Sequence, residues 1–551
     1  MAFFVLFALL AFCSGQSVSP TTSPSPSITP CSAQPGFFCN GGSALICPIG
    51  AYCAGGSALN VSCYPVTACT VAGLSAQPPC YWNVSTLAGS GTPGFAEGVG
   101  HFASFNRPDR IVVDDNGRYV IGDAQNHRIR LVTASGNVST LAGSGSQASI
   151  DGQGVLASFS SPYGVARYNG SIAVTDFSGN RIRVISLSGY VSTLAGTGGA
   201  GSSNGPLLSS TFNAPTALAA DSFYNLYVVD KLNHKVRLVN ITSRLVSTVV
   251  GTGSATWADG IGTSASINQP NDILIVNDTF WILTGMAENR LRSVSLPLYA
   301  VNTLAGSGAA TVIDGVGTNA AFFNPAAAVL SPVGIVYVSD YRGNRIRSMV
   351  LVSRAVTTLA GSGVASSTGG YALAATFKFP HGIAITVSGV LVVGDETTST
   401  IRQLSCVPCP ASYFCISGAP VLCPAGFYCP LSSINATLCP KGFFSNAGAS
   451  NCTSCPAGTF ASTTGSTSCK QCPGGHYCPA RASSWARLNC GLGNYCPDGS
   501  GAPTPCPYQV PPPGGWGALQ VQGPAFLVET AHCLNHCFWN FTSGDGMLSK
   551  C

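Results

Sequence analysis

The sequence predicts an all-β fold: a six-bladed β-propeller with small disulfide-rich modules on its N-terminal and C-terminal sides. Three observations predict it. A motif of the type V-S-T-L-A-G-S-G occurs six times, the six copies fill a stretch without cysteine between Cys80 and Cys406, and cysteines crowd both flanks of that stretch. Self-similarity at one fixed period indicates a repeat architecture, in which each unit packs on its neighbours.

The repeated motif sets the period of the ring. Its first glycine recurs every 53 to 55 residues, and a proline recurs in step with it. The glycines are Gly89, Gly143, Gly196, Gly251, Gly306 and Gly361, and the prolines are Pro108, Pro162, Pro215, Pro270, Pro325 and Pro380.

Within one unit, four short runs alternate apolar and polar residues. In the first unit these runs are RIVVDD, RYVIGD, HRIRLV and NVSTLAG, and turn residues separate them at Asn116-Gly117, AQN and Ser135-Gly136. This pattern predicts a four-stranded antiparallel meander. One such sheet cannot bury both faces, so the units pack side by side and six of them close a ring.

The order of the strands predicts how the ring closes. The first recognisable strand, NVSTLAG at Asn83, is of the fourth-strand type, whereas the chain leaves the sixth unit after its third strand, TIRQLS. We therefore expect the N-terminal strand to complete blade six, which protects the open sheet edge. Cys80 and Cys406 fall at the same hairpin of that blade, and we predict a disulfide between them.

The hairpins of these units resemble the NHL repeat, a propeller blade with a D-x-x-N-x-R-I-x hairpin. The matches are DAQNHRIR at Asp123, DFSGNRIR at Asp176, DKLNHKVR at Asp230 and DYRGNRIR at Asp340. Blade four departs from the pattern with Gly285 in GMAENRLR, and blade six departs from it with DETTSTIR. The resemblance covers residues 81–406 and implies an NHL-type propeller.

The charged residues of the hairpins recur in register, which favours a structural role. We expect the aspartates to accept hydrogen bonds from the turns that follow them, the arginines to form salt bridges between neighbouring blades, and His127 and His234 to lie at the surface. The arginines are Arg130, Arg183, Arg237, Arg292, Arg347 and Arg402. The D-G-x-G text at Asp151, Asp259 and Asp314, with Glu97 and Asn204 in equivalent places, is interpreted as a turn rather than a calcium loop.

The residues after the repeat prolines begin the innermost strands, where side chains line the central channel of a propeller. They are Asp109, Tyr163, Thr216, Asn271, Ala326 and His381. Carboxylate and amide oxygens suit Ca²⁺ and histidine suits Zn²⁺, so Asp109, Asn271 and His381 are the metal candidates among them. A cluster of several histidines is absent from these positions. We therefore predict no catalytic residue and no cofactor, with Ca²⁺ or Zn²⁺ kept as the alternative.

The flanks predict an exported protein. We assign residues 1–15 to a signal peptide, 16–30 to a Ser/Thr/Pro-rich linker, 31–80 to a cysteine-rich module, 81–406 to the propeller, 407–510 to cysteine-rich repeats and 511–551 to a Pro-rich segment with an irregular cysteine-containing tail. The text from Cys452 to Cys478 resembles ephrin-receptor-like cysteine-rich repeats. Its C-x2-C-x13-C-x2-C spacing also resembles a zinc ribbon, but disulfides are favoured in an exported chain. Sequons for N-glycosylation occur at Asn60, Asn83, Asn137, Asn169, Asn240, Asn277, Asn435, Asn451 and Asn540.

These features favour a secreted or cell-surface interaction or scaffold protein whose propeller binds an extracellular protein or glycan. The alternative is a metal-dependent extracellular hydrolase or lyase, like the gluconolactonase-like or amidating-lyase-like propellers. Nucleic acid is excluded as a partner because the chain has only 8% charged residues, a net charge of +5 and no basic tract. No segment predicts a membrane span, and attachment to the cell surface would require sequence beyond Cys551.

Overall fold

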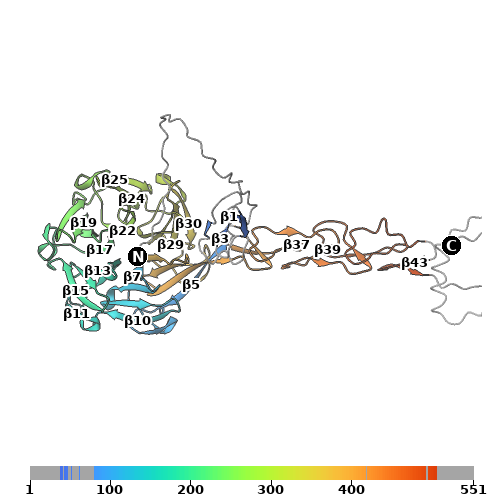
Figure 1. Cartoon of the computed structure of the whole chain (residues 1–551), viewed down its shortest axis with the longest axis horizontal. Coiled ribbons are helices and arrows are strands. Elements are labelled where there is room, and N and C mark those ends of the chain that lie inside the picture. The colour runs from blue at the N-terminus through green and yellow to red at the C-terminus, as the bar shows by residue number, and fades with distance from the viewer. Residues whose placement is uncertain are drawn as a thin grey trace, which may run out of the picture.

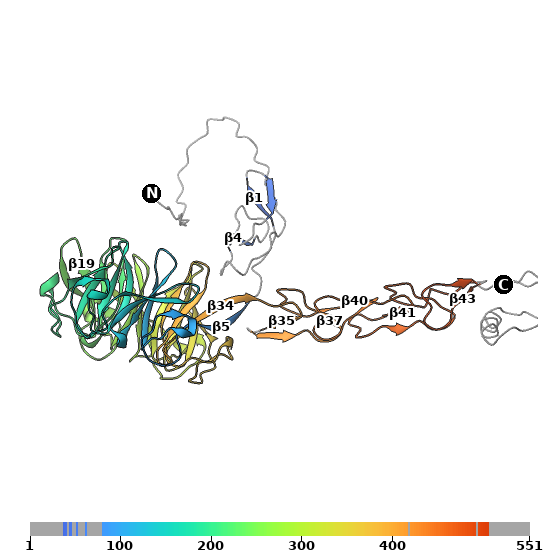
Figure 2. The same cartoon turned by 90° about the horizontal axis from the view of Figure 1, so that it is seen from below.

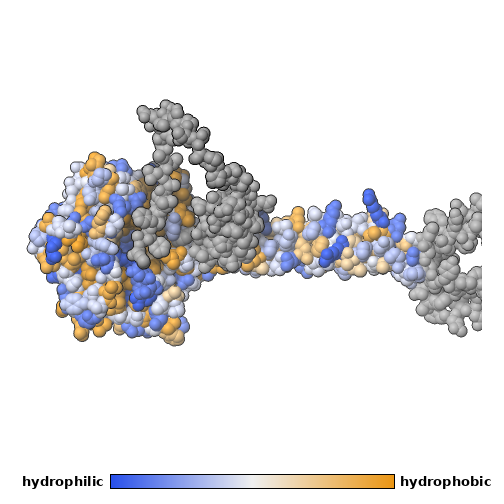
Figure 3. Space-filling view, viewed as in Figure 1, coloured by the Kyte–Doolittle hydropathy of each residue, from blue (hydrophilic) through white to orange (hydrophobic). Residues whose placement is uncertain are grey.

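The structure is a computed structural model that describes residues 37–40, 43–46, 51–52, 61–62, 80–416, 419–491 and 494–505. The predicted signal peptide and linker, most of the N-terminal cysteine-rich module, the tail, Asn60 and Asn540 lie outside these residues. A ring of blades carries a long cysteine-rich arm on one side (Figures 1, 2 and 3). The predicted all-β, six-bladed propeller with a disulfide-rich C-terminal region is confirmed.

Each blade is a twisted antiparallel sheet in which neighbouring strands follow one another along the chain, because each tight turn returns the chain beside the strand it has just left. The first, innermost strands are β7 (Pro108–Val113), β12 (Pro162–Tyr168), β17 (Pro215–Ala220), β22 (Pro270–Asn277), β27 (Pro325–Leu330) and β32 (Pro380–Ile385). The second strands are β8 (Tyr119–Asp123), β13 (Ser171–Asp176), β18 (Leu226–Asp230), β23 (Phe280–Gly285), β28 (Ile335–Asp340) and β33 (Leu391–Asp395). The third strands are β9 (Arg128–Val132), β14 (Arg181–Ile185), β19 (Lys235–Asn240), β24 (Arg290–Ser295), β29 (Arg345–Val350) and β34 (Thr400–Pro408). The fourth strands are β10 (Asn137–Ala142), β15 (Tyr190–Ala195), β20 (Leu245–Val250), β25 (Ala300–Ala305), β30 (Ala355–Ala360) and β5 (Cys80–Ala88).

The blades have one strand more than the predicted four. A two-residue fifth strand pairs with the outer side of each fourth strand, and in the first five blades a 3-10 turn follows it. The fifth strands are β6 (Gly98–Val99), β11 (Gly152–Gln153), β16 (Gly205–Pro206), β21 (Gly260–Ile261), β26 (Gly315–Val316) and β31 (Gly370–Tyr371). The turns that follow are η2 (Gly100–Phe102), η4 (Gly154–Leu156), η5 (Leu207–Ser209), η7 (Gly262–Ser264) and η8 (Gly317–Asn319). So short an edge strand leaves few unpaired backbone groups at the rim.

The N-terminal strand closes the ring as predicted. β5 lies between β34 and β31, so blade six takes its fourth strand from the start of the propeller. Cys406 is disulfide-bonded, and the register pairs it with Trp82 and pairs Cys80 with Pro408. The two cysteines are therefore diagonal neighbours on adjacent strands, and the disulfide between them stays a prediction.

The core of the propeller lies between the blades rather than within them. Apolar side chains of each blade pack on those of the next, as in the cluster in which Tyr227 and Val229 of blade three meet Trp281 and Leu283 of blade four. A buried phenylalanine recurs in five blades, three residues before the repeat proline: Phe105, Phe159, Phe212, Phe322 and Phe377. Burial between neighbours explains why one unit cannot fold alone.

The antiparallel order gives the ring two distinct faces. Turns between first and second strands and between third and fourth strands all lie at one end of the sheets, which we call the 1–2 face. Hairpins between second and third strands lie at the other end, which we call the 2–3 face. The loops that link the blades begin and end at this face, and their fifth strands reach back along the rim to the beginnings of the fourth strands. Two of these hairpins contain the 3-10 turns η3 (Ala124–Asn126) and η6 (Lys231–Asn233).

The cysteine-rich arm, residues 409–505, is a stack of small disulfide-bonded hairpins. They are β35 (Tyr413–Ile416) with β36 (Ala419–Leu422), β37 (Phe427–Tyr428) with β38 (Thr437–Leu438), β39 (Phe443–Phe444) with β40 (Thr453–Ser454), β41 (Thr459–Phe460) with β42 (Lys470–Gln471), and β43 (Asn494–Tyr495) with β44 (Thr504–Pro505). Six disulfides join Cys409 to Cys415, Cys423 to Cys429, Cys439 to Cys452, Cys455 to Cys469, Cys472 to Cys478 and Cys490 to Cys496. Backbone hydrogen bonds such as Gly442 N–H to Ala461 C=O (2.9 Å) tie one hairpin to the next. The four cysteines with zinc-ribbon spacing thus belong to three different disulfides.

The N-terminal module contributes only four short strands to the described residues: β1 (Phe37–Asn40), β2 (Ser43–Ile46), β3 (Ala51–Tyr52) and β4 (Val61–Ser62). β1 pairs with β2 and β3 pairs with β4. No helix in the described part of the chain is long and apolar enough to span a membrane.

Candidate functional site

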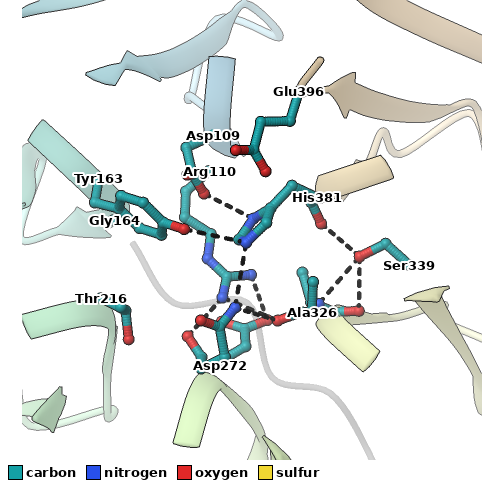
Figure 4. Close-up of polar contacts among 12 residues, drawn as sticks. Asp109, Arg110, Tyr163, Gly164, Thr216, Asp272, Ala326, Ser339, His381 and Glu396 are labelled. Carbon is teal, nitrogen blue, oxygen red and sulfur yellow. Dashed lines mark hydrogen bonds and ion pairs between the residues drawn. The ribbon is translucent and has the colours of Figure 1, made fainter. Parts of the chain in front are cut away.

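The six residues that follow the repeat prolines all begin inner strands and are all buried. Their exposed fractions range from 0% for Asp109, Thr216, Asn271 and Ala326 to 6% for Tyr163. The inner strands contact one another around the ring, so five of these six positions meet at its centre, while Thr216 lies to one side (Figure 4). The chain therefore fills the centre of the ring near the 2–3 face with its own side chains.

A histidine and a carboxylate form the middle of this cluster. His381 Nδ1 lies 2.7 Å from Asp109 Oδ1, and His381 Nε2 lies 3.2 Å from the hydroxyl oxygen of Tyr163. Both Asp109 and His381 are almost completely buried. Burial also raises the pKa of Tyr163 well above its ordinary value, so this hydroxyl keeps its proton and can donate it.

Asn271 fixes the orientation of the histidine. Its Oδ1 accepts a hydrogen bond from Lys231 Nζ at 3.0 Å, and its Nδ2 donates to the Ala326 carbonyl at 2.9 Å. An ammonium group can only donate and a carbonyl can only accept, so these two partners distinguish the amide oxygen of Asn271 from its nitrogen. The Asn271 Nδ2, which lies 3.4 Å from His381 Nε2, is therefore a donor. His381 Nε2 therefore faces two donors, the hydroxyl of Tyr163 and the amide of Asn271.

The three metal candidates therefore lie together but do not form a metal site. Asp109 faces His381, the histidine nitrogen that could bind a metal faces two donors, and the Asn271 oxygen faces an ammonium group. A divalent cation would have to displace Lys231 from that oxygen and the donors from His381. In the described ranges, no group of three or more His, Cys, Asp and Glu side chains could hold a metal ion.

Arg110 crosses the channel from blade one and forms the floor under this cluster. Its Nη2 donates to the carbonyls of Asn271 (2.6 Å) and Ala326 (3.1 Å), and its Nη1 lies 3.1 Å from Asp272 Oδ2. Asp272 in turn accepts the Ala328 N–H at 2.9 Å. This buried ion pair joins blades one, four and five across the ring (Figure 4). Below it, a cavity of about 780 Å³ opens on the 1–2 face.

Above the cluster, a second set of residues covers the channel at the 2–3 face, and the sequence analysis missed it. These are the residues that follow the hairpin aspartate or its equivalent: Ala124, Phe177, Lys231, Met286, Tyr341 and Glu396. The Tyr163 ring stacks on Phe177 with centroids 5.2 Å apart, and Tyr341 meets His381 edge-on at 5.5 Å. Glu396 forms an ion pair with Arg107. A signal existed in the sequence, because this position differs in every blade whereas the residue before it is an aspartate in five of the six blades.

The hairpin charges form pairs within each blade, so the prediction of salt bridges between neighbouring blades was wrong. Arg130 Nη1 lies 2.9 Å from Asp123 Oδ2, and Arg183 Nη1 lies 3.2 Å from Asp176 Oδ2, each across the second and third strands of one sheet. Strand pairing brings these positions together because both side chains point to the same face of the sheet. The arginines are stacked near the recurring phenylalanines, as with Arg130 and Phe105 at 5.3 Å.

The D-G-x-G aspartates are further partners of these arginines. Asp151, Asp259 and Asp314 bind Arg183, Arg292 and Arg347 at 2.6, 2.6 and 2.7 Å. Asn204 accepts from Arg237 at 2.8 Å in the same place, whereas Glu97 accepts the Thr140 N–H instead. The carboxylates of the three aspartates therefore pair with buried guanidinium groups. Neither the turn interpretation nor the calcium-loop interpretation included this role.

Links between blades come from a different hairpin position. His127 Nδ1 accepts the Ser161 N–H of the next blade at 3.1 Å, and His234 Nδ1 accepts the Gln269 N–H at 3.0 Å. Asn180, Asn289 and Asn344 accept in the same way through their amide oxygens. The two histidines, which we expected at the surface, are half-buried, and each binds the neighbouring blade.

The propeller and the arm are each similar to known proteins. A curated protein from Bos taurus, NHL repeat-containing protein 2, is 27% identical over 334 residues, which are 54% of this chain and 46% of that protein. Its Homo sapiens counterpart is 26% identical over 335 residues. The propeller is therefore similar to NHL repeat-containing proteins. The chain spans about half the length of the curated relatives it matches.

The arm also has a match. The family model described as "Tyrosine-protein kinase ephrin type A/B receptor-like" covers residues 442–487, within the disulfide-bonded hairpins. Among solved structures, a structural-genomics protein of unknown function from Bacteroides thetaiotaomicron aligns with a TM-score of 0.47 and 20% identity over 59% of this chain and 76% of that chain. A gluconolactonase from Xanthomonas campestris aligns with a TM-score of 0.41 and 11% identity over 60% of this chain and 95% of that chain. An NHL propeller joined to an ephrin-receptor-like segment suggests an interaction or scaffold role.

Proposed function

We propose that this chain is a secreted or cell-surface interaction or scaffold protein that binds protein or glycan ligands through its NHL propeller. The observation that carries the proposal is the direct joining of a propeller to a disulfide-bonded arm. β5 and β34 are nine residues long and pair through eight residues of each, and β36 of the arm contacts β5. The arm thus extends directly from blade six and holds the propeller at a distance from whatever its far end contacts (Figure 2).

The composition of the arm supports an extracellular role. Twelve of its cysteines form six disulfides, which are stable in oxidising compartments and rare in the cytosol. The domain division given above, with a signal peptide at residues 1–15 and a linker at 16–30, belongs to the same proposal. The hydrolase or lyase alternative gains no support from the geometry, because the groups that would bind a metal face one another.

The proposal is tested by expressing the full chain in cultured eukaryotic cells. We expect it in the medium, with glycosidase-sensitive N-glycans, and we expect non-reducing peptide mapping to recover the six arm disulfides and a Cys80–Cys406 link. Retention inside the cells with reduced cysteines would contradict the proposal. Elemental analysis of the purified chain decides the alternative: one tightly held Ca²⁺ or Zn²⁺ per chain, whose chelation lowers the melting temperature, would support an enzyme.

A further inference from the structure

The ion pair of Arg110 and Asp272 crosses the whole width of the central channel. Both residues lie two positions after the repeat proline, in blades one and four, and the order in which the inner strands contact one another places these blades on opposite sides of the ring. The other four blades have only glycine or alanine at this position: Gly164, Ala217, Ala327 and Gly382. Because those residues are small, the Arg110 side chain has room to reach Asp272 (Figure 4). The ion pair therefore closes the inner end of the cavity that opens on the 1–2 face.

The walls of this cavity are aliphatic. The residue three positions after the repeat proline lines the cavity in every blade, and each of the six keeps an exposed fraction between 5% and 8%. We call these six residues the aliphatic ring: Ile111, Val165, Leu218, Ile273, Ala328 and Ile383. Equivalent positions with nearly the same exposed fraction surround one opening. A molecule in the cavity would therefore meet apolar groups on every side.

The size of the cavity suits a small molecule rather than a macromolecule. Its volume of about 780 Å³ falls in the range of small-molecule sites, roughly 300–1,000 Å³. Along blade one its lining runs from Arg110 to Val113, a rise of about 10 Å at about 3.3 Å per strand residue. The cavity is thus deep enough to enclose a short chain-like molecule from end to end.

The floor of the cavity keeps hydrogen-bonding atoms that the described residues do not use. Arg110 is 5% exposed, and within the described part of the chain its Nε has no hydrogen-bond partner. Asp272 is 9% exposed, and its Oδ2 takes both the contact with Arg110 and the hydrogen bond from the Ala328 N–H. This arrangement leaves the Asp272 Oδ1 as an acceptor for a donor in the cavity. The floor therefore combines a guanidinium donor with a carboxylate acceptor.

The charge balance of the floor favours a neutral ligand. Arg110 and Asp272 neutralise each other, so a carboxylate or an ammonium group brought to the floor would be a buried charge without a counter-ion of its own. A hydroxyl group has no charge, and it can donate to a carboxylate and accept from a guanidinium. Water among aliphatic walls lacks hydrogen-bond partners, so an apolar body that displaces it gains free energy.

We propose that the channel on the 1–2 face binds a neutral aliphatic alcohol, with its hydroxyl group at the Arg110–Asp272 pair and its apolar body inside the aliphatic ring. This site goes beyond the proposed binding of a protein or glycan, because a macromolecule cannot enter the channel. It also does not depend on where in or outside the cell the chain works.

The test is isothermal titration calorimetry of the purified full chain with three probes of equal chain length: 1-octanol, octanoate and octylamine. We expect one 1-octanol to bind per chain, and we expect octanoate and octylamine to bind at least about tenfold more weakly, because each brings an uncompensated charge to the floor. Asp272→Asn should reverse the preference between 1-octanol and octanoate. Arg110 then lacks its carboxylate, and the carboxylate of octanoate can replace it.

A second pair of variants tests the location and leaves the floor intact. Ala328→Phe places a bulky side chain in the aliphatic ring and should weaken 1-octanol binding at least about tenfold. Ala355→Phe adds the same group on the same blade, at a half-buried residue that begins β30 and does not line the cavity, and should leave binding unchanged. Melting curves show whether each variant is folded, and this pair decides the location if Asp272→Asn does not fold.

Three results would overturn the site: no saturable binding of 1-octanol, equal affinity for the three probes, or equal loss of binding in the two phenylalanine variants. A folded Asp272→Asn chain that keeps the preference for 1-octanol would show that the ion pair does not hold the polar end of the ligand, and the assignment would be wrong. All of these measurements use purified chain, so their failure is distinct from a failure of secretion, which would contradict the proposed function instead.

Discussion

Among the charged residues of the propeller, Arg110 should lower the free energy of unfolding the most when its side chain is replaced. Arg110 is 5% exposed. Its guanidinium donates to two carbonyls of other blades at 2.6 and 3.1 Å and lies 3.1 Å from Asp272 Oδ2. Arg110→Met would leave Asp272, which is 9% exposed, as a buried carboxylate without its cation. Breaking a buried ion pair by removing one partner costs about 3–5 kcal/mol, and the two orphaned carbonyls add to this. We therefore expect a loss of about 4 kcal/mol in the free energy of unfolding.

The assay is urea unfolding of the chain followed by tryptophan fluorescence, since Trp281 is fully buried in the propeller core. Asp272→Asn in the Arg110→Met background should restore much of the loss, because it removes the uncompensated charge. Arg167→Met is the matched control: it breaks the ion pair with Asp115, whose two side chains are 58% and 60% exposed, and should cost less than about 1 kcal/mol. The reasoning is refuted if Arg110→Met costs no more than Arg167→Met, or if the double variant loses the sum of the two single changes.

Three further predictions follow from particular contacts. Burial raises the pKa of Asp395 to about 7 in the folded chain, above its unfolded value, so between about pH 4 and 7 the folded chain keeps a proton that the unfolded chain has lost. The stability that this group contributes is full below about pH 4 and is lost as the pH rises through 7. The free energy of unfolding should therefore fall between about pH 4 and 7 by up to about 4 kcal/mol, and Asp395→Asn should flatten that slope in urea titrations at several pH values; an unchanged slope would contradict the assignment. Asn344→Ala removes the acceptor of the Phe379 N–H (3.0 Å) and should cost about 1–3 kcal/mol in the same assay, whereas an effect near zero would show that the inter-blade hydrogen bonds are dispensable. In Gly382→Ala the new Cβ would lie 1.9 Å from the Asp109 carbonyl oxygen, so soluble expression or the melting temperature should drop sharply, while Gly94→Ala, with 3.8 Å of room, should behave like the parent; equal behaviour of the two would disprove the close approach of blades six and one.

Much of the fold was predictable because the sequence repeats in register. The spacing of Gly89 and its equivalents, together with the hairpin motif, defined six units, and the missing fourth strand of the last unit defined the closure by β5. The fifth strands were not predictable, because a pair such as Gly98–Val99 is too short for any alternation of apolar and polar residues to show. The arm disulfides were beyond reach as well, since sixteen cysteines allow too many pairings.

The site was predictable in position but not in its contacts. The repeat proline placed Asp109 and His381 at the start of inner strands, yet their contact depends on the closure of the ring, which brings blades one and six together. The same holds for Tyr163 and His381, which are separated by 218 residues in the chain. The intra-blade pairing of Arg130 with Asp123 depends on which face of the sheet each side chain occupies, and the repeat alone does not distinguish that from a partner in the next blade.

The central claim is the proposal that this propeller and its arm work outside the cell as an interaction or scaffold protein. Site-by-site glycopeptide mass spectrometry of the full chain, purified from the medium of expressing cells, tests it most directly. The account predicts N-glycans at Asn137, Asn169 and Asn277 on the 1–2 face, in a chain whose cysteines are oxidised. A chain that stays inside the cell, with these asparagines unmodified and its cysteines reduced, would contradict it.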